Sequence, residues 1–85
     1  MPPYQLFLHG RVYEFFAGLP RAKRSSLIIF LRTLAADPFR PHDYQEAVHE
    51  FYVSVKLFEA HAILYRVDHA AKELKVVEIR PADKS

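Results

Sequence analysis

Residues 51–68 read FYVSVKLFEAHAILYRVD, and this stretch decides the fold class. In its first half an apolar side chain returns at every second position from Phe51 to Leu57. A period of two predicts a half-buried strand whose alternate side chains lie on opposite faces of a sheet. Glu59-Ala60 is expected to be a turn, and the branched and aromatic run from Ile63 to Asp68 predicts a second strand.

The residues that follow continue the same pattern. Leu74 to Arg80 predicts a last strand, which ends at Pro81. The connections between the three strands are short, and short connections favour antiparallel neighbours, so residues 51–80 predict an antiparallel meander. Before the meander, the stretch from Phe39 to Tyr44 is expected to be a loop, since two prolines flank Arg40.

Towards the N-terminus the period changes from two to that of a helix. Tyr4 to Leu8 predicts a first strand, and the stretch after it predicts a short helix that stops at Gly18 and Pro20. A second helix is expected to end at Asp37-Pro38, because the residue before a proline avoids the α region. The apolar face of the first helix comprises Val12, Phe15, Phe16 and Leu19. That of the second helix comprises Leu27, Leu31, Leu34 and Ala35.

The predicted order of elements is therefore β-α-α-β-β-β. Helices grouped before a meander indicate an α+β fold, with a helical hairpin packed on one face of a mainly antiparallel four-stranded sheet. We expect one domain over residues 1–85 and place Leu31 between the hairpin and the sheet.

Composition limits the kinds of function. The 85 residues include no cysteine, which leaves neither a disulfide framework nor a thiolate metal site and fits a cytoplasmic protein. We expect no signal peptide and no membrane span. The five histidines lack the spacing of a metal site, and the two glycines form no phosphate-binding loop, so neither a metal nor a cofactor is expected. The net charge of +2 permits contact with nucleic acid without requiring it.

Strand alternation predicts which side chains lie on the sheet face that the helices leave open. If Phe51, Val53, Val55 and Leu57 face the helices, their neighbours face outward. Two interpretations of this open face remain: a surface with ion pairs of Glu78 to Lys56 or Arg66, or a cationic groove that binds a phosphate backbone. The predicted open face comprises Tyr52, Lys56, Leu64, Arg66, Val76, Glu78 and Arg80.

Several short motifs, in order along the chain, resemble those of the RelE/ParE superfamily of bacterial toxins. An aromatic pair precedes a Leu-Pro break in Phe15-Phe16-Ala17-Gly18-Leu19-Pro20, and the second helix ends in Leu34-Ala35-Ala36-Asp37-Pro38-Phe39. The middle strand of the meander is Ile63-Leu64-Tyr65-Arg66-Val67-Asp68. The last strand ends on a basic residue in Val76-Val77-Glu78-Ile79-Arg80.

The resemblance implies the toxin of a type II toxin–antitoxin module, a kind of module associated with plasmid stabilisation and growth inhibition. A cognate antitoxin would silence it. The assembly would be either a toxin–antitoxin hetero-oligomer or a homodimer of the toxin. One branch of the superfamily acts on translation as an mRNA interferase at the ribosome. Another branch inhibits DNA gyrase without catalysis, and a member that has lost its toxicity is a third alternative.

The resemblance also implies candidate site residues, with a departure. The RNA-cleaving branch carries an arginine where this chain has Ala62. Phosphate contacts would then come from Lys56, Arg66 and Arg80, with His61 or Glu46 as a general base. The resulting catalytic candidates are Arg80, Lys56 and His61. Because of Ala62, whether the protein is an enzyme stays open, and we expect any ribosome-dependent endoribonuclease activity to be weak.

Overall fold

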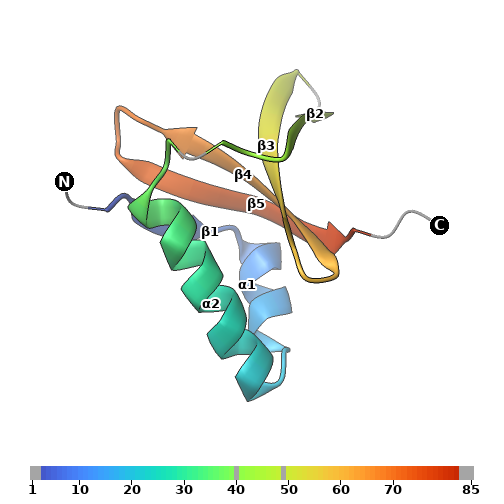
Figure 1. Cartoon of the computed structure of the whole chain (residues 1–85). Helices are drawn as coiled ribbons and strands as arrows, with labels where there is room; N and C mark the ends of the chain where they lie inside the picture. The colour runs from blue at the N-terminus through green and yellow to red at the C-terminus, as the bar shows by residue number, and fades with distance from the viewer. Residues whose placement is uncertain (1–2, 40, 49, 83–85) are drawn as a thin grey trace.

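A computed structural model describes residues 3–39, 41–48 and 50–82. Two helices lie on one side of a five-stranded mixed sheet with the strand order β1-β5-β4-β3-β2 (Figure 1). Among the described residues, no helix is both long and apolar enough to cross a membrane. The elements in chain order are β1 Gln5–Leu8, α1 Gly10–Ala17, α2 Arg21–Ala36, β2 Tyr44–Val48, β3 Phe51–Phe58, β4 His61–Asp68 and β5 Glu73–Pro81.

The α+β class and the helical hairpin on a mainly antiparallel sheet are confirmed. Only β1 pairs in parallel, with β5, and the other three pairings are antiparallel. The sheet has five strands and not four, because residues 44–48 form the edge strand β2 along β3. This strand escaped the sequence pattern because Tyr44-Gln45-Glu46-Ala47-Val48 lacks a regular alternation of apolar and polar residues.

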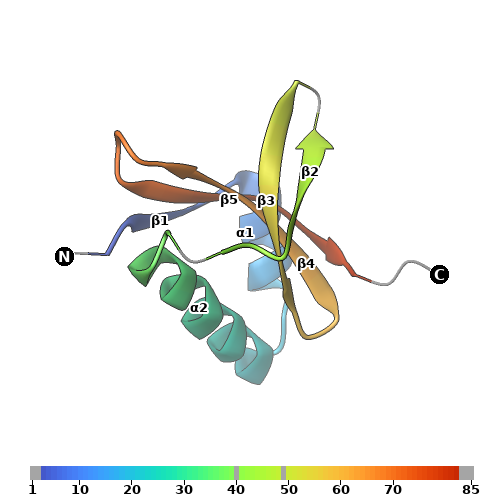
Figure 2. The same cartoon turned by 45° about the horizontal axis from the view of Figure 1, so that its top comes forward.

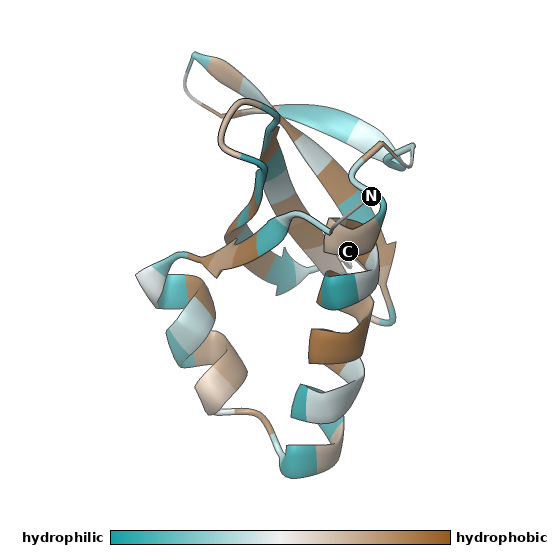
Figure 3. Cartoon of the chain, turned by 90° about the vertical axis from the view of Figure 1, so that its left-hand side faces the viewer, coloured by the Kyte–Doolittle hydropathy of each residue, from teal (hydrophilic) through white to brown (hydrophobic). Residues whose placement is uncertain are grey.

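The helices bury the faces that their spacing predicted. In α2 the buried residues are Leu27, Leu31, Leu34 and Ala35, and Leu31 has no exposed surface. In Figure 3 hydrophilic and hydrophobic stretches alternate along both helices, as expected for helices with one face on a core and one in solvent. The prediction that Leu31 lies in the core under the hairpin is confirmed.

The turn between the helices is held by a side chain of α2. Arg24 Nη1 donates to the carbonyl oxygen of Leu19 at 3.0 Å and to that of Ala17 at 3.5 Å. Ala17 is the last residue of α1 and Leu19 lies just after it, where no backbone N–H within the helix remains to pair with their carbonyls. Arg24 therefore ties the start of α2 to the end of α1 and helps to set the hairpin angle.

The two faces of the sheet carry separate hydrophobic clusters. The helix face, defined by Ile63, Tyr65, Leu74 and Val76, packs under α1 and α2. The far face, defined by Val53, Val55, Ala62 and Leu64, points away from the helices. Directly paired residues share a face, so the pairing of Val55 with Leu64 places β3 and β4 side chains in the same far-face cluster.

The facing that the sequence predicted for β3 is wrong. Val53 and Val55 were expected under the helices, but they belong to the far face. The helices pack mainly over β1 and β5, and at β3 they reach Phe58, whose ring stacks on Phe30 of α2 at 4.3 Å. Towards the start of β3 the helices no longer cover the sheet (Figure 1), and the aliphatic side chains of β3 are buried on the far face.

The predicted alternation of β5 fails at a bulge. Leu64 pairs with Glu78, but the next residue of β4, Tyr65, pairs with Val76, so Val77 is an extra residue in β5. The bulge lets Val76 and Ile79 both pack against the helix-face cluster. Val76 and Leu64, both predicted to be exposed on the open face, have no exposed surface.

Candidate functional site

The far face has an aliphatic floor. Val53, Val55, Ala62 and Leu64 are buried there, and Val77 packs against them from the bulge of β5. Large side chains with much exposed surface stand around this floor on the same face, namely Tyr44, Phe51 and Leu57. An apolar patch with an exposed aromatic rim is typical of a surface that meets another macromolecule.

Arg80 lies on the far face, where it is held by two carboxylates. Its Nη2 donates to Glu46 Oε2, and its Nη1 lies 3.7 Å from Glu78 Oε2. The hydrogen bond to Glu46 is the main reason why the pKa of Arg80 is raised above the usual value for an arginine. The two carboxylates offset the guanidinium charge, so Arg80 does not make a cationic groove in this structure.

Arg66 lies at the end of the far face, away from Arg80. Its guanidinium carbon stands 4.8 Å from the centre of the Phe51 ring, which is a cation–π contact between β4 and β3. The predicted ion pair of Glu78 with Lys56 or Arg66 is not found among the described residues, where Glu78 pairs with Arg80.

Lys56 points to the opposite side of the sheet from Arg80, because it pairs directly with Ile63 of the helix face. Its Nζ lies 3.4 Å from Asp43 Oδ1. The pKa of Asp43 is lowered first by the N–H of Leu57, which donates to Asp43 Oδ2 at 2.7 Å, and then by Lys56. Lys56 thus helps to fasten the start of β2 to β3.

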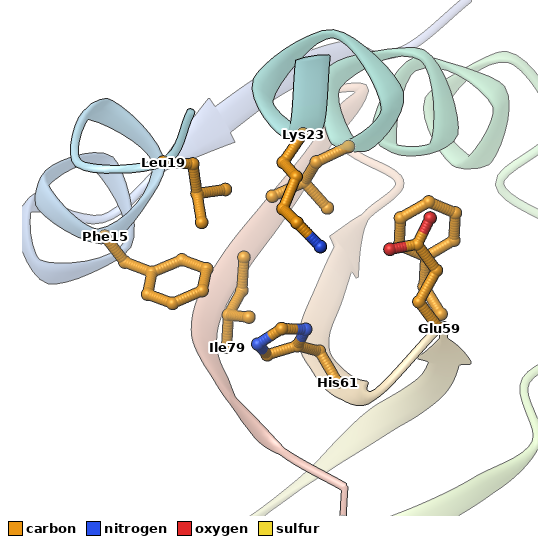
Figure 4. A pocket seen from close by; sticks show the side chains of 8 residues that line it. Phe15, Leu19, Lys23, Glu59, His61 and Ile79 are labelled. Atoms are coloured by element: carbon orange, nitrogen blue, oxygen red, sulfur yellow. The ribbon is translucent and has the colours of Figure 1, made fainter. Parts of the chain in front are cut away.

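His61 occupies a third place, at the end of the helix face. It lines a small cavity of about 30 Å³ between the two helices and the β3–β4 turn, and its ring meets Phe15 edge-on at 5.4 Å. Figure 4 shows the Lys23 amino group pointing into the same space. The cavity is small, with room for about one water molecule.

The three catalytic candidates are therefore not assembled into one site. Arg80 lies on the far face, whereas Lys56 and His61 lie on the other side of the sheet. The predicted open face is divided in the same way. Leu64, Arg66, Glu78 and Arg80 belong to the far face, Tyr52 and Lys56 lie on the opposite side, and Val76 is in the helix-face core.

The pairing of Arg80 with Glu46 was not predicted from the sequence. Glu46 was expected only as an alternative general base, because residues 44–48 were not recognised as a strand. No signal in residues 44–48 could have revealed this pairing, because they show no regular alternation of apolar and polar residues. Once β2 is placed beside β3, its even-numbered residues face the same side as Val53 and Val55.

Comparisons with known proteins give a clear likeness of fold. No family model matches the sequence, and no curated protein matches it. The RelBE2 toxin–antitoxin complex of Mycobacterium tuberculosis contains a chain with a TM-score of 0.78 and 18% identity, covering 98% of this chain and 97% of that chain. The archaeal RelE–RelB complex of Pyrococcus horikoshii gives a TM-score of 0.77 at 18% identity, covering 99% and 100%.

The isolated RelE toxin of E. coli matches with a TM-score of 0.76 and 15% identity, over 96% of this chain and 87% of that chain. In each of these matches the alignment runs through both helices and the whole sheet, because it covers nearly all of the chain. This protein therefore has the fold of the RelE toxins over nearly its whole length.

Proposed function

We propose that this protein is the toxin component of a toxin–antitoxin pair, that an antitoxin neutralises it, and that it inhibits growth in the cytoplasm by acting on translation. The observation that carries the proposal is the RelE fold, which extends over nearly the whole chain. Two of the similar structures are complexes of a toxin with its antitoxin, which supports an antitoxin as the partner.

The far face supports a partner surface rather than an efficient nuclease site. Cleavage of RNA by its own 2′-hydroxyl needs a base and several cations around one phosphate. Here Arg80 is engaged by Glu46, and His61 and Lys56 lie on the other side of the sheet. The floor beside Arg80 is aliphatic, and the exposed rings of Tyr44 and Phe51 suit a docked chain. We therefore infer inhibition by docking.

The first test is growth. Induced expression in a bacterial host should arrest growth, and co-expression of the short reading frame beside the gene should release the arrest. Purified antitoxin should also raise the melting temperature, because a ligand that binds only the folded state stabilises it by mass action. Absence of arrest by an intact, folded protein would overturn the proposal that it is a toxin.

The second test separates docking from cleavage. Messenger ends are mapped in a translating extract with the wild type, with Arg80→Ala, and with Arg32→Ala as a matched control on the exposed side of α2. Docking predicts stalled translation with intact messengers. Codon-phased cuts that disappear in Arg80→Ala but remain in Arg32→Ala would show catalysis and would reject docking. Arrest through inhibited DNA supercoiling, with normal translation, would reject translation as the target.

A further inference from the structure

The floor of the far face is buried although it lies on the side of the sheet away from the helices. Val55 and Leu64 have no exposed surface, and Val53 and Ala62 are only 3% and 2% exposed. The helices cover the opposite face of the sheet (Figure 1). The surface that the proposed function assigns to a partner is therefore closed in this structure, and the sheet itself closes it.

A contact between two distant strands shows how the sheet closes this floor. β5 and β2 have two strands between them in the order β5-β4-β3-β2, which places them about 14 Å apart in a flat sheet. Arg80 of β5 nevertheless donates a hydrogen bond from Nη2 to Glu46 Oε2 of β2. Both side chains lie on the far face, because each of these residues pairs with a floor residue, Ala62 in one case and Val53 in the other. The sheet therefore curls towards its far face until its β2 edge reaches over the floor.

We call the ion pair of Glu46 with Arg80 the clasp. The two side chains are 32% and 37% exposed, so water and salt reach the clasp and its contribution to stability is small. Glu78 lies 3.7 Å from the same guanidinium, but it belongs to β5 like Arg80. Glu78 therefore orients the arginine without joining the two edges of the sheet, whereas Glu46 joins them. The clasp is a contact between strands that can open and close.

The part of the sheet that carries the glutamate of the clasp is separate from the central strands. Among the described residues, pairing between β3 and β4 ends at Ser54 and Tyr65, although β3 begins at Phe51 and β4 runs to Asp68. From there outward β3 pairs with β2, and β4 pairs with β5. Figure 1 and Figure 2 both show the β2–β3 hairpin standing apart from β4 and β5 beyond this point. We call the outer part of this hairpin, β2 with residues 51–53 of β3, the arm.

The arm is fastened at its base and held by side chains at its outer end. At the base, the N–H of Asp43 donates to the carbonyl oxygen of Val55 at 2.9 Å, and the Asp43 carboxylate accepts from the N–H of Leu57 at 2.7 Å. At the outer end, the ring of Phe51 lies under the guanidinium of Arg66 on β4 at 4.8 Å, and the clasp joins β2 to β5. This difference between base and outer end predicts a hinge where the pairing of β3 with β4 stops.

We propose that the arm is a hinged cover, that the clasp holds it over the floor, and that a partner docks on the far face only after the arm opens. In the closed state the floor is buried, and two carboxylates engage Arg80. Opening exposes the apolar floor and frees the guanidinium together, so the docking surface forms only in the open state. A partner that binds only the open state shifts the population towards it.

This inference deepens the proposed function and rests on it for the role of the opening in docking. The hinge itself is tested on the isolated protein, with no partner and no growth assay. The sequence contains no cysteine, so a single introduced thiol reports on one position. The rate at which a buried thiol reacts measures how often its surroundings open.

The experiment compares two valines without exposed surface, one on each face of the sheet. Val55→Cys places the thiol in the floor, and Val76→Cys places it in the core under the helices. Alkylation by iodoacetamide is followed by mass spectrometry at increasing urea concentrations. Val55→Cys should react at least about tenfold faster and with little dependence on urea, because opening of the arm exposes little surface. Val76→Cys should react only through unfolding, with a steep dependence on urea.

Within the Val55→Cys protein, further substitutions test the clasp. Glu46→Gln should raise the alkylation rate about two- to fivefold, the effect expected for an exposed ion pair. Arg80→Gln should raise it at least as much, because it leaves Glu46 and Glu78 without a shared cation. Glu78→Gln is the matched control: it removes a carboxylate from the same arginine but does not free the arm, so the rate should not rise. High salt should raise the rate when the clasp is intact and leave the rate of Glu46→Gln unchanged.

Either of two results would overturn the hinge. In the first, Val55→Cys reacts as slowly as Val76→Cys and with the same dependence on urea, so the floor opens only when the protein unfolds. In the second, Glu46→Gln is alkylated no faster than Glu78→Gln. Melting curves check that each variant is folded, and Ala62→Cys, on the β4 side of the floor, replaces Val55→Cys if that protein does not fold.

The role of the clasp in docking has its own measurement. Glu46→Gln should arrest growth at a protein level about two- to fivefold lower than the wild type and Glu78→Gln need, because a larger fraction of the protein is open to a partner. Faster alkylation without this shift in growth arrest would overturn the role of the clasp in docking. No arrest by any variant would instead reject the proposed function, and the alkylation rates would still decide the hinge.

Discussion

Both faces of the sheet carry a buried aliphatic cluster, but only the helix face is covered by helices. The helix face is closed by α1 and α2, and its aliphatic core includes Leu31, Ile63 and Val76, none of which has exposed surface. The far face has a smaller buried floor, and large rings such as Phe51 remain exposed beside it. The part of the sheet under the helices is therefore committed to the core, whereas the far face can stabilise the fold and still receive a partner.

The largest expected effect tests the closed face. Leu31→Ala should lower the free energy of unfolding by about 2–5 kcal/mol, because the helices above it cannot collapse fully into the space that is left. Urea denaturation measures the change. Ile29→Ala is the matched control, since Ile29 lies on the same helix and is 65% exposed, and it should stay within about 0.5 kcal/mol of the wild type. Equal effects of the two variants would contradict the helix-on-sheet packing.

A second substitution makes the same deletion on the other face. Leu64→Ala should cost roughly 2–3 kcal/mol, at the lower end for a buried leucine, because the floor of the far face has no helix over it and can relax. The measurement is again the free energy of unfolding in urea. A cost below about 0.5 kcal/mol would mean that Leu64 is exposed in solution, as strand alternation alone predicted.

The sequence predicted one of these faces much better than the other. The helix spacing of Leu27, Leu31 and Leu34 gave the buried stripe of α2 correctly, because a helix has one period and one core to face. The far face could not be predicted in that way. Alternation predicts that two sets of β3 side chains lie on opposite faces of the sheet. It does not predict which of these faces the helices cover.

Two local irregularities account for most of the remaining error. The extra residue Val77 shifts the alternation of β5 by one position, and nothing in Val76-Val77-Glu78-Ile79 marks a bulge. The exposed edge strand β2 has too few apolar residues to show a period. Without β2 the partner of Arg80 was unknown, so Arg80 was treated as a cation available to phosphate.

A third prediction concerns the charge of the far face. Glu46→Gln removes the strongest partner of Arg80 and leaves Glu78 at 3.7 Å. The freed guanidinium should then let the far face contact a phosphate backbone. The affinity for single-stranded RNA at low salt should rise about two- to fivefold, with a slightly steeper salt dependence, because one more cation can neutralise a phosphate. Anisotropy titrations measure both quantities. Glu73→Gln is the control, since it removes a carboxylate from Lys75 in another part of β5. An equal gain in both variants would assign the effect to net charge alone.

The smallest expected effect on stability concerns the carboxyl group of Asp43, which lies beside Lys56. Because the folded protein lowers the pKa of Asp43 below its ordinary value of 3.8, its ionised form stabilises the fold. That contribution is complete above the ordinary pKa and is lost as the pH falls through the lower, folded value. Asp43→Asn should therefore cost less than about 1 kcal/mol at neutral pH, since the carboxyl group is near the surface.

The difference between wild type and Asp43→Asn should shrink as the pH falls below roughly 4, where the wild-type carboxyl group also becomes neutral. Urea midpoints at several pH values measure this convergence. Glu14→Gln, an exposed carboxylate on α1, serves as the control and should show no such convergence. A cost for Asp43→Asn that persists unchanged in acid would mean that the hydrogen bond to the Leu57 N–H, and not the charge beside Lys56, fastens β2 to β3.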